Sequence, residues 1–238
     1  PSIDARLVNR LGLRSDVKRV PIFGLGCVAG AAGIARAADY LAAYPDQAAV
    51  LLSVELCSLT LQRDDLSVPN LIASGLFGDG AAAVVLGGRR RGLAGPRVLA
   101  TRSVFYPDTE RVMGWDVTDG GFRIVLSADV PEVVRDFLRR DVDAFLAEHG
   151  LTRDRITTWI AHPGGPKVLL AMAEALELGD GALEPAWRTL REVGNLSSTS
   201  VLLVLEDVMR ASRPPNGSYG VILAMGPGFC SEFVLVRW

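Results

Sequence analysis

Histidine and cysteine are scarce in this chain of 238 residues, which has two histidines and three cysteines. Cys27, Cys57 and Cys230 are odd in number and lack the short spacings of metal-binding motifs. Two histidines leave a zinc site without enough ligands. We therefore predict no metal site and expect a reduced, cytoplasmic protein.

Long apolar runs and an excess of one charge are also absent. No run of roughly 18 apolar residues and no charged-then-apolar leader occurs, so we expect neither a membrane span nor a signal peptide. The 25 Lys and Arg residues against 27 Asp and Glu residues give a net charge of −2. No basic stripe with interleaved aromatic residues appears, which argues against a nucleic-acid partner. The apolar content of 49% is typical of a well-packed globular protein.

Short apolar runs alternate with helical patterns along the whole chain. Expected strands cover residues 20–23, 48–56, 81–86, 98–105, 122–126, 157–161, 220–224 and 232–236, and expected helices cover residues 5–11, 34–41, 71–76, 130–149, 167–178, 187–193 and 197–211. Strands that are apolar throughout are typical of strands covered on both faces, so we predict an α/β protein in helix-covered layers. The Gly- and Arg-rich segment 87–96 is the best internal boundary. Both halves repeat the same order of elements, which indicates a duplicated unit.

Cys27 lies in the small-residue stretch Gly24–Gly33, between an apolar run of strand character and an Ala-rich helical pattern. At a strand-to-helix junction, the positive end of the helix dipole favours the thiolate, which makes a nucleophile. A small buried cysteine in a Gly-rich turn is the alternative interpretation.

His162 and Asn195 occupy two further element ends. His162 ends an expected strand and enters a Pro-Gly-Gly-Pro turn, and Asn195 follows Gly194 ahead of an expected helix. A structural histidine and a helix-capping asparagine are the local alternatives. Cys, His and Asn at three such positions also form a complete chemical set. The thiolate attacks, the imidazole partners it, and imidazole and carboxamide donate hydrogen bonds to a developing oxyanion.

Five motifs together resemble the type III polyketide synthases, the chalcone-synthase-like members of the thiolase superfamily. They are Gly26–Gly30, Leu76–Ala83, Ile160–Pro166, Gly194–Ser198 and Gly226–Gly228. Their order is that of the family, and the match covers essentially the whole chain. The resemblance implies a thiolase-like layered αβαβα fold with duplicated halves, a homodimer, and a catalytic triad of Cys27, His162 and Asn195.

The resemblance also implies a reaction on coenzyme A thioesters. Cys27 takes an acyl starter from an acyl-CoA. Malonyl-CoA is then decarboxylated while His162 and Asn195 hold its thioester oxygen, and the carbanion attacks the Cys27 thioester. Repetition and cyclisation to a pyrone or a resorcinol follow, with no metal or redox cofactor. Two preorganised donors stabilise the charge that develops in such a step and lower its barrier by several kcal/mol.

The similar proteins carry a further N-terminal portion, so we expect an incomplete first half. Residues 1–90 would be its remainder, carrying the nucleophilic cysteine, and residues 91–238 would be the C-terminal half, carrying His and Asn. In that portion the family has basic residues that meet the coenzyme A phosphates and a loop that reaches into the partner's cavity.

Segments 55–60 and 106–115 resemble the bacterial branch that makes alkylpyrones and alkylresorcinols from fatty acyl starters. Ile124 stands where plant members have a gatekeeper phenylalanine, and Met225 also replaces a phenylalanine. The candidate substrate-binding residues are Cys57, Thr60, Trp115, Ile124, Lys167 and Ser197. A small core thiol, a strand-end hydroxyl and a solvated lysine are the alternatives for Cys57, Thr60 and Lys167.

Other functions fit some of these features. A ketoacyl-ACP synthase of fatty-acid initiation shares the triad and the Gly-Asn turn, although the turns at 162–166 and 226–228 argue against it. A Cys-His hydrolase and a non-catalytic thiolase-fold dimerisation module remain as alternatives.

Overall fold

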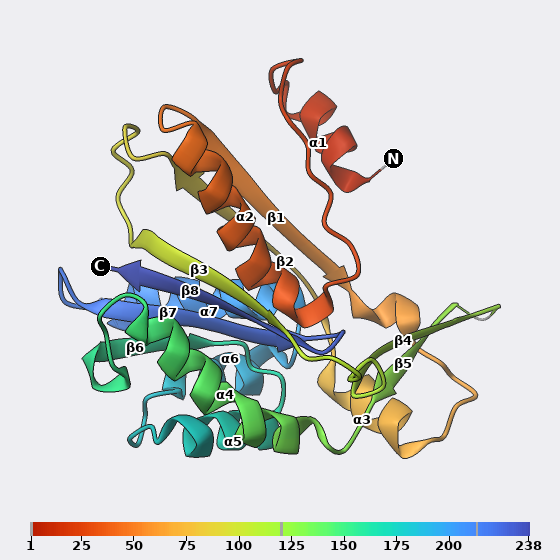
Figure 1. Ribbon diagram of the computed structural model, residues 1–238. Helices are drawn as coiled ribbons and strands as arrows, with labels where there is room; N and C mark the ends of the chain where they lie inside the picture. The colour runs from red at the N-terminus through yellow and green to blue at the C-terminus, as the bar shows by residue number, and fades with distance from the viewer. Residues whose placement is uncertain (1, 120, 213) are drawn as a thin grey trace.

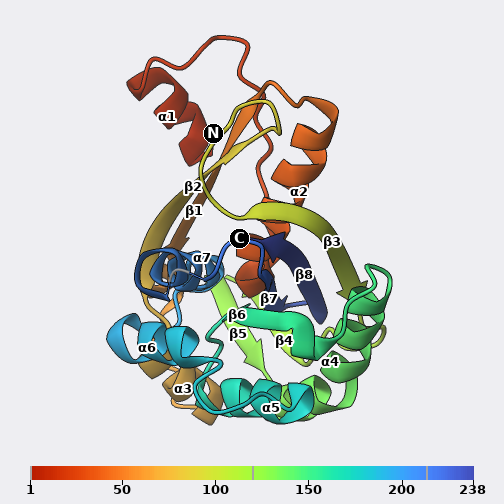
Figure 2. The same ribbon diagram turned by 90° about the vertical axis from the view of Figure 1, so that its left-hand side faces the viewer.

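Four stacked layers make up the part of the chain that the computed structural model describes, residues 2–119, 121–212 and 214–238 (Figure 1, Figure 2). Helices α4 (Val130–Ala147) and α5 (Pro166–Leu176) lie on one side of a four-stranded sheet. Helices α2 (Ala29–Ala43) and α7 (Ser198–Asp207) pack between that sheet and a second sheet of two strands. The predicted layered α/β arrangement is therefore confirmed.

The four-stranded sheet holds most of the buried strand residues. Its order is β3 (Arg97–Phe105), β8 (Cys230–Arg237), β7 (Tyr219–Gly226) and β6 (Ile156–Ala161). The β3/β8 and β8/β7 pairs are antiparallel, and the β7/β6 pair is parallel. Strands β7 and β8 are buried along nearly their whole length because helices cover both faces of the sheet, as the sequence predicts.

The two-stranded sheet is covered on one face only. It pairs β1 (Ala48–Leu56) with β2 (Asp79–Gly87). Val50, Leu52, Val54 and Leu56 are between 41% and 58% exposed. Because successive side chains of a strand point to opposite faces, α2 and α7 bury only every second residue of β1. The prediction that residues 48–56 are covered on both faces is therefore wrong for the described part of the chain.

The remaining elements lie around these layers. They are α1 (Ile3–Arg10), α3 (Val68–Leu76), the hairpin of β4 (Met113–Thr118) and β5 (Gly121–Leu126), and α6 (Glu184–Val193). Helix α1 has no buried residue and stands apart from the layers in Figure 1. None of the helices in the described ranges combines the length and the apolar character that crossing a bilayer requires.

Two local predictions differ from the structure near the ends of these elements. Residues 20–23 form no strand, and Phe23 is 87% exposed, because no neighbouring strand offers its backbone a ladder of hydrogen bonds. Strand β4 was not expected from the sequence. Its alternating pattern is weak, and pairing with β5 rather than burial stabilises it.

A buried hydroxyl joins three elements on the side of the sheet where α4 lies. The Tyr106 hydroxyl donates a hydrogen bond to Oδ2 of Asp141 on α4 at 2.8 Å and lies 2.9 Å from the Ser231 hydroxyl on β8. Arg140 forms an ion pair with the other carboxylate oxygen at 2.8 Å. This network fixes α4 against the end of the central sheet.

Replacing Tyr106 by phenylalanine leaves the buried Asp141 carboxylate short of one donor. We expect Tyr106→Phe to lower the free energy of unfolding by roughly 1–3 kcal/mol, measured by urea denaturation. Tyr219→Phe is the matched control, since its hydroxyl makes no hydrogen bond to the described residues. Equal losses in the two variants would contradict the assignment.

Candidate functional site

Cys27 lies in a single 3-10 turn, η1 (Gly26–Val28), that leads directly into α2. The segment before it is irregular, so the predicted strand-to-helix junction is a loop-to-helix junction. Small residues allow close approach, as expected. A Cβ on Gly30 would lie 2.2 Å from the Ser198 carbonyl oxygen, so only glycine lets α7 pack this near.

The Cys27 side chain is 6% exposed, and burial raises the pKa of its thiol to about 12. Hydrogen bonding by the side chains of Ser197 and Asn195 lowers this pKa, whereas the charges of Glu55 and Cys57 raise it further. Burial thus acts against the thiolate. That the helix dipole favours the thiolate at this position stays a prediction.

His162 follows the last residue of β6 and remains in the sheet ladder. Its backbone N–H donates to the Leu223 carbonyl oxygen on β7 at 2.8 Å. The side chain is 2% exposed, and neither ring nitrogen has a hydrogen-bond partner among the described residues. Burial lowers the pKa of the imidazole to about 4, so it is neutral at neutral pH. One ring nitrogen is thus free to donate and the other to accept.

Asn195 is held by its backbone and by both ends of its carboxamide. Its N–H donates to the Leu76 carbonyl oxygen at 2.9 Å, and its own carbonyl accepts from the Gly78 N–H at 3.0 Å. Side-chain Oδ1 accepts from the Ser197 N–H at 2.8 Å, and Nδ2 donates to the Gly164 carbonyl oxygen at 3.1 Å. These partners fix the orientation of the amide and leave one Nδ2 proton for a further acceptor.

His162 and Asn195 both border Gly164. The Asn195 carboxamide donates to the Gly164 carbonyl at 3.1 Å. A Cβ on Gly164 would lie 3.7 Å from Nε2 of His162, so the imidazole borders the same residue. The connection to Cys27 is electrostatic, since hydrogen bonding by Asn195 lowers the pKa of the Cys27 thiol.

Three of the predicted substrate-binding residues lie near this group or contact one another. Ser197 is buried, and hydrogen bonding by its side chain lowers the pKa of the Cys27 thiol. Cys57 is half-buried, and burial raises the pKa of its thiol to about 11. The Thr60 hydroxyl donates to the Cys57 carbonyl oxygen at 2.8 Å, so it closes the short helix η2 (Cys57–Thr60).

The other three predicted substrate-binding residues lie on more exposed elements. Trp115 and Ile124 are opposite each other in the β4/β5 ladder, so they share one face of the hairpin. Trp115 packs edge-on against Phe122, with ring centroids 6.0 Å apart. Lys167 is exposed in the first turn of α5, after the turn that holds His162. Within the described ranges, no interaction joins these three residues to Cys27.

Glu55 is a site residue that the sequence analysis missed. Its Oε1 accepts from the Ser198 N–H at 3.2 Å and from the Ser198 hydroxyl, which ties β1 to the first turn of α7. Ser53 on β1 adds a hydrogen bond of 2.8 Å to the same hydroxyl. The signal was present, since Glu55 is the only charged residue in the apolar run 48–56.

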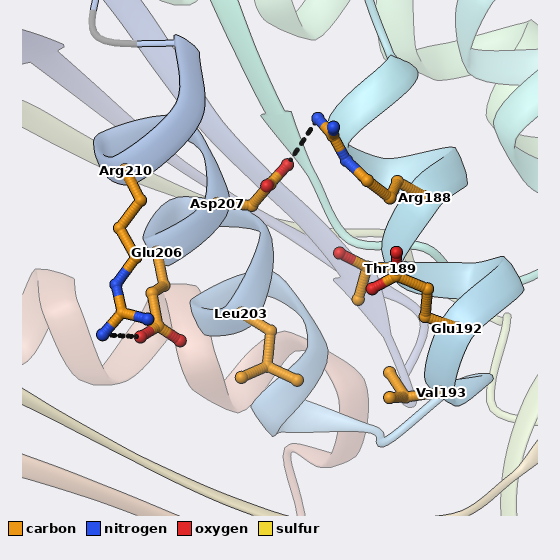
Figure 3. A pocket seen from close by; sticks show the side chains of 8 residues that line it. All are labelled: Arg188, Thr189, Glu192, Val193, Leu203, Glu206, Asp207 and Arg210. Atoms are coloured by element: carbon orange, nitrogen blue, oxygen red, sulfur yellow. Dashed lines mark hydrogen bonds and ion pairs between the residues drawn. The ribbon is translucent and has the colours of Figure 1, made fainter.

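A pocket of about 240 Å³ lies elsewhere, between α6 and α7 (Figure 3). Its arginines are already paired: Arg188 with Asp207 and Arg210 with Glu206, each at 2.9 Å. Cys27, His162 and Asn195 do not line it. The pocket is therefore separate from the group around Gly164.

The lowered pKa of His162 makes stability depend on pH. As pH falls below 6.5, the unfolded chain takes up a proton that the folded chain accepts only near pH 4, so folding is weakened. We expect a loss of roughly 3 kcal/mol from this group between about pH 7 and pH 4. Urea denaturation at both pH values should show that loss in the wild type and not in His162→Gln.

The exposed His149 provides the control, as His149→Gln should retain the wild-type dependence on pH. A His162→Gln variant that loses as much stability as the wild type would contradict the burial of a neutral imidazole.

Comparisons with known proteins give the same family for both parts of the chain. The model for the N-terminal domain of chalcone and stilbene synthases matches residues 1–89, and the model for their C-terminal domain matches residues 97–238. The chain is 63% identical to a 1,3,6,8-tetrahydroxynaphthalene synthase of Streptomyces peucetius subsp. caesius, with all of this chain and 64% of that protein aligned. It is 42% identical to a putative chalcone synthase of Bacillus subtilis, of which it covers 67%. The chain thus spans about two thirds of the length of these relatives.

A solved structure shares the fold closely. The crystal structure of 1,3,6,8-tetrahydroxynaphthalene synthase from Streptomyces coelicolor A3(2), a bacterial type III polyketide synthase, superposes with a TM-score of 0.96 at 36% identity, over all of this chain and 68% of that one. The thiolase-like layered fold is therefore confirmed, with the first half incomplete in this chain. The chain belongs to the chalcone and stilbene synthase family, the type III polyketide synthases.

Proposed function

We propose that this chain carries the reaction centre of a type III polyketide synthase, which condenses malonyl-CoA onto an acyl starter held as a Cys27 thioester. The observation that supports it is that the imidazole of His162 and the carboxamide of Asn195 border the same residue, Gly164, while the carboxamide also lowers the pKa of the buried Cys27 thiol. Coenzyme A thioesters are the substrates, and the proposal requires no metal or redox cofactor.

The first step of the proposed reaction is transfer of the starter to Cys27. Burial raises the pKa of the thiol and lowers the pKa of the imidazole, which favours the neutral form of each group before the substrate arrives. His162 takes the thiol proton as the sulfur attacks the thioester carbonyl of the acyl-CoA. The bond from that carbonyl carbon to the coenzyme A sulfur then breaks, and His162 returns the proton to the departing sulfur.

The second step is decarboxylation of malonyl-CoA and formation of a carbon–carbon bond. Loss of carbon dioxide places negative charge on the thioester oxygen, where the remaining Nδ2 proton of Asn195 and an N–H of neutral His162 can both donate. The carbanion then attacks the Cys27 thioester carbonyl and releases the sulfur. Donors that are already oriented lower the activation free energy by several kcal/mol, because little reorganisation is needed during the reaction.

Starter and product are proposed from the relatives and from the candidate lining residues. The 63% identical relative is named for a tetrahydroxynaphthalene, which favours a polyhydroxylated aromatic product built from malonyl units. The alkylpyrone or alkylresorcinol product from a fatty acyl starter stays a prediction. We propose that Cys57, Thr60, Trp115, Ile124 and Ser197 border the growing chain and that Lys167 lies at the coenzyme A entrance.

We further propose that the active protein is a homodimer whose subunits contain an additional N-terminal segment. About a third of each relative lies outside the aligned part, and the exposed apolar face of β1 and the unburied α1 are surfaces that such polypeptide would cover. Sedimentation of the full-length protein tests the dimer.

Substitutions at the reaction centre should separate its two steps. Cys27→Ala should abolish both starter loading and product. Asn195→Ala should still load the starter on Cys27, detected by mass spectrometry, while decarboxylation of malonyl-CoA falls roughly 100-fold or more. Cys230→Ala, on β8, is the control and should remain active. Product formation by Cys27→Ala would refute the proposed nucleophile.

Substrate assays on the full-length enzyme should identify the reaction class. We expect turnover of malonyl-CoA. Malonyl-CoA alone should give a naphthalene-type product, and alkylpyrones should form only if long acyl-CoA starters are accepted. Mass spectrometry of the products from acyl-CoAs of graded chain length distinguishes these two outcomes. Activity solely with malonyl carried on acyl-carrier protein would instead support a fatty-acid ketosynthase. No condensation, together with no preferential alkylation of Cys27, would support a non-catalytic module.

A further inference from the structure

We propose that Asp79 is a positioning residue whose carboxylate holds the short helix η2 (Cys57–Thr60) in the place where Cys57 and Thr60 border the acyl chain. This role rests on the proposed function, because only there do Cys57 and Thr60 border the substrate. Asp79 lies in the motif Leu76–Ala83, whose residues take no part in the two reaction steps. The carboxylate in that motif is therefore without an assigned role.

Asp79 binds Ser58 through both of its carboxylate oxygens. Oδ1 accepts from the Ser58 N–H at 2.7 Å, and Oδ2 accepts from the Ser58 hydroxyl at 2.6 Å. Hydrogen bonds to an ionised group are about twice as strong as those between neutral groups. The same two bonds hold the pKa of the Asp79 carboxyl below its ordinary value. Asp79 is exposed in the described part of the chain, so these bonds, and not burial, fix its side chain.

Asp79 reaches Ser58 because it lies opposite the end of β1. Leu56 and Asp79 form the terminal pair of the antiparallel β1/β2 ladder, and η2 begins at the next residue, Cys57. The first N–H groups of a helix have no partner inside it. The side chain of Leu56, which precedes η2, has no atom that accepts a hydrogen bond. The carboxylate on the neighbouring strand therefore supplies the acceptor.

The residue that Asp79 holds lies between the two proposed lining residues. The Thr60 hydroxyl donates to the Cys57 carbonyl oxygen at 2.8 Å, and the Leu61 N–H donates to the Ser58 carbonyl oxygen at 3.4 Å. Bonds within η2 thus fix its shape, and the bonds to Asp79 fix where it lies relative to β2. A displacement of Ser58 consequently displaces Cys57 and Thr60.

The segment that carries Asp79 is also bonded to Asn195. The Asn195 N–H donates to the Leu76 carbonyl oxygen at 2.9 Å, and the Gly78 N–H donates to the Asn195 carbonyl oxygen at 3.0 Å. Asp79 follows Gly78 directly. Its carboxylate therefore connects η2 to the same stretch of backbone that holds the candidate oxyanion donor, so that the proposed substrate-lining residues and the reaction centre share one frame.

Hydrogen–deuterium exchange of the full-length protein, measured by mass spectrometry on peptides covering residues 57–61, tests the contact without any substrate. Asp79→Ala removes both acceptors and should speed exchange of the Ser58 amide about tenfold. Asp79→Asn keeps an oxygen for the N–H and gains an amide that can donate to the hydroxyl, so it should retain most of the protection. Ser58→Ala loses one of the two bonds and should give an intermediate rate.

The ratio of kcat/KM for a long and a short acyl-CoA starter tests the positioning role. A displaced η2 changes the space beside the acyl chain, so Asp79→Ala should change this ratio about tenfold, and Asp79→Asn should retain the wild-type ratio. A purely structural role would lower the fraction of folded enzyme equally for both starters. The ratio would then not change.

Asp46→Ala is the matched control. Asp46 also binds a single residue through both carboxylate oxygens, since it pairs with Arg90, whose Nε lies 2.6 Å from Oδ1. It precedes the opposite end of the β1/β2 ladder, which begins at Ala48. Asp46→Ala should therefore change neither the exchange of residues 57–61 nor the ratio between starters.

Unchanged exchange in Asp79→Ala, faster exchange with an unchanged ratio, or an equal effect of Asp46→Ala would overturn the inference. If Asp79→Ala does not fold, Ser58→Ala takes its place, and wild-type behaviour of that variant in both measurements would overturn it. No condensation by the wild type with any acyl-CoA would refute the proposed function, whereas exchange at residues 57–61 would still decide whether Asp79 holds η2.

Discussion

Asn195 is the residue on which the rest of the site depends. Its backbone bonds the end of α3, and its carboxamide bonds the turn after β6 and the start of α7. One residue therefore fixes α3, the turn after β6 and the start of α7 relative to one another. A residue that fills so many roles tolerates little movement, which is what a preorganised donor requires.

Burial is the second constraint, and it favours the neutral form of both acid–base groups. Removing water raises the pKa of Cys27 and lowers the pKa of His162, which favours the neutral form of each group before reaction. A neutral pair can pass a proton in either direction without first separating charge inside the protein. Hydrogen bonding by Ser197 and Asn195 lowers the pKa of Cys27 and so acts against the effect of burial.

The two sheets of the fold are unequally covered, and this difference follows from where the helices lie. Layers α4/α5 and α2/α7 enclose the central sheet, which is consequently the buried core of the molecule. The β1/β2 sheet meets only α2 and α7, so half of its apolar side chains remain exposed. The apolar sequence of β1 is typical of a strand covered on both faces. In the described part of the chain, helices cover only one of these faces.

The sequence by itself determined the order and type of the main elements, the layered α/β class, the family and the three residues of the candidate centre. These follow from local periodicity and from motifs whose residue types the chemistry requires. Only the tertiary structure decided that residues 20–23 form no strand, that Glu55 contacts Ser198 and that burial raises the pKa of the Cys27 thiol. Each of these depends on which distant segment lies nearby and on how much water it excludes, and neither quantity is encoded in the spacing of residues along the chain.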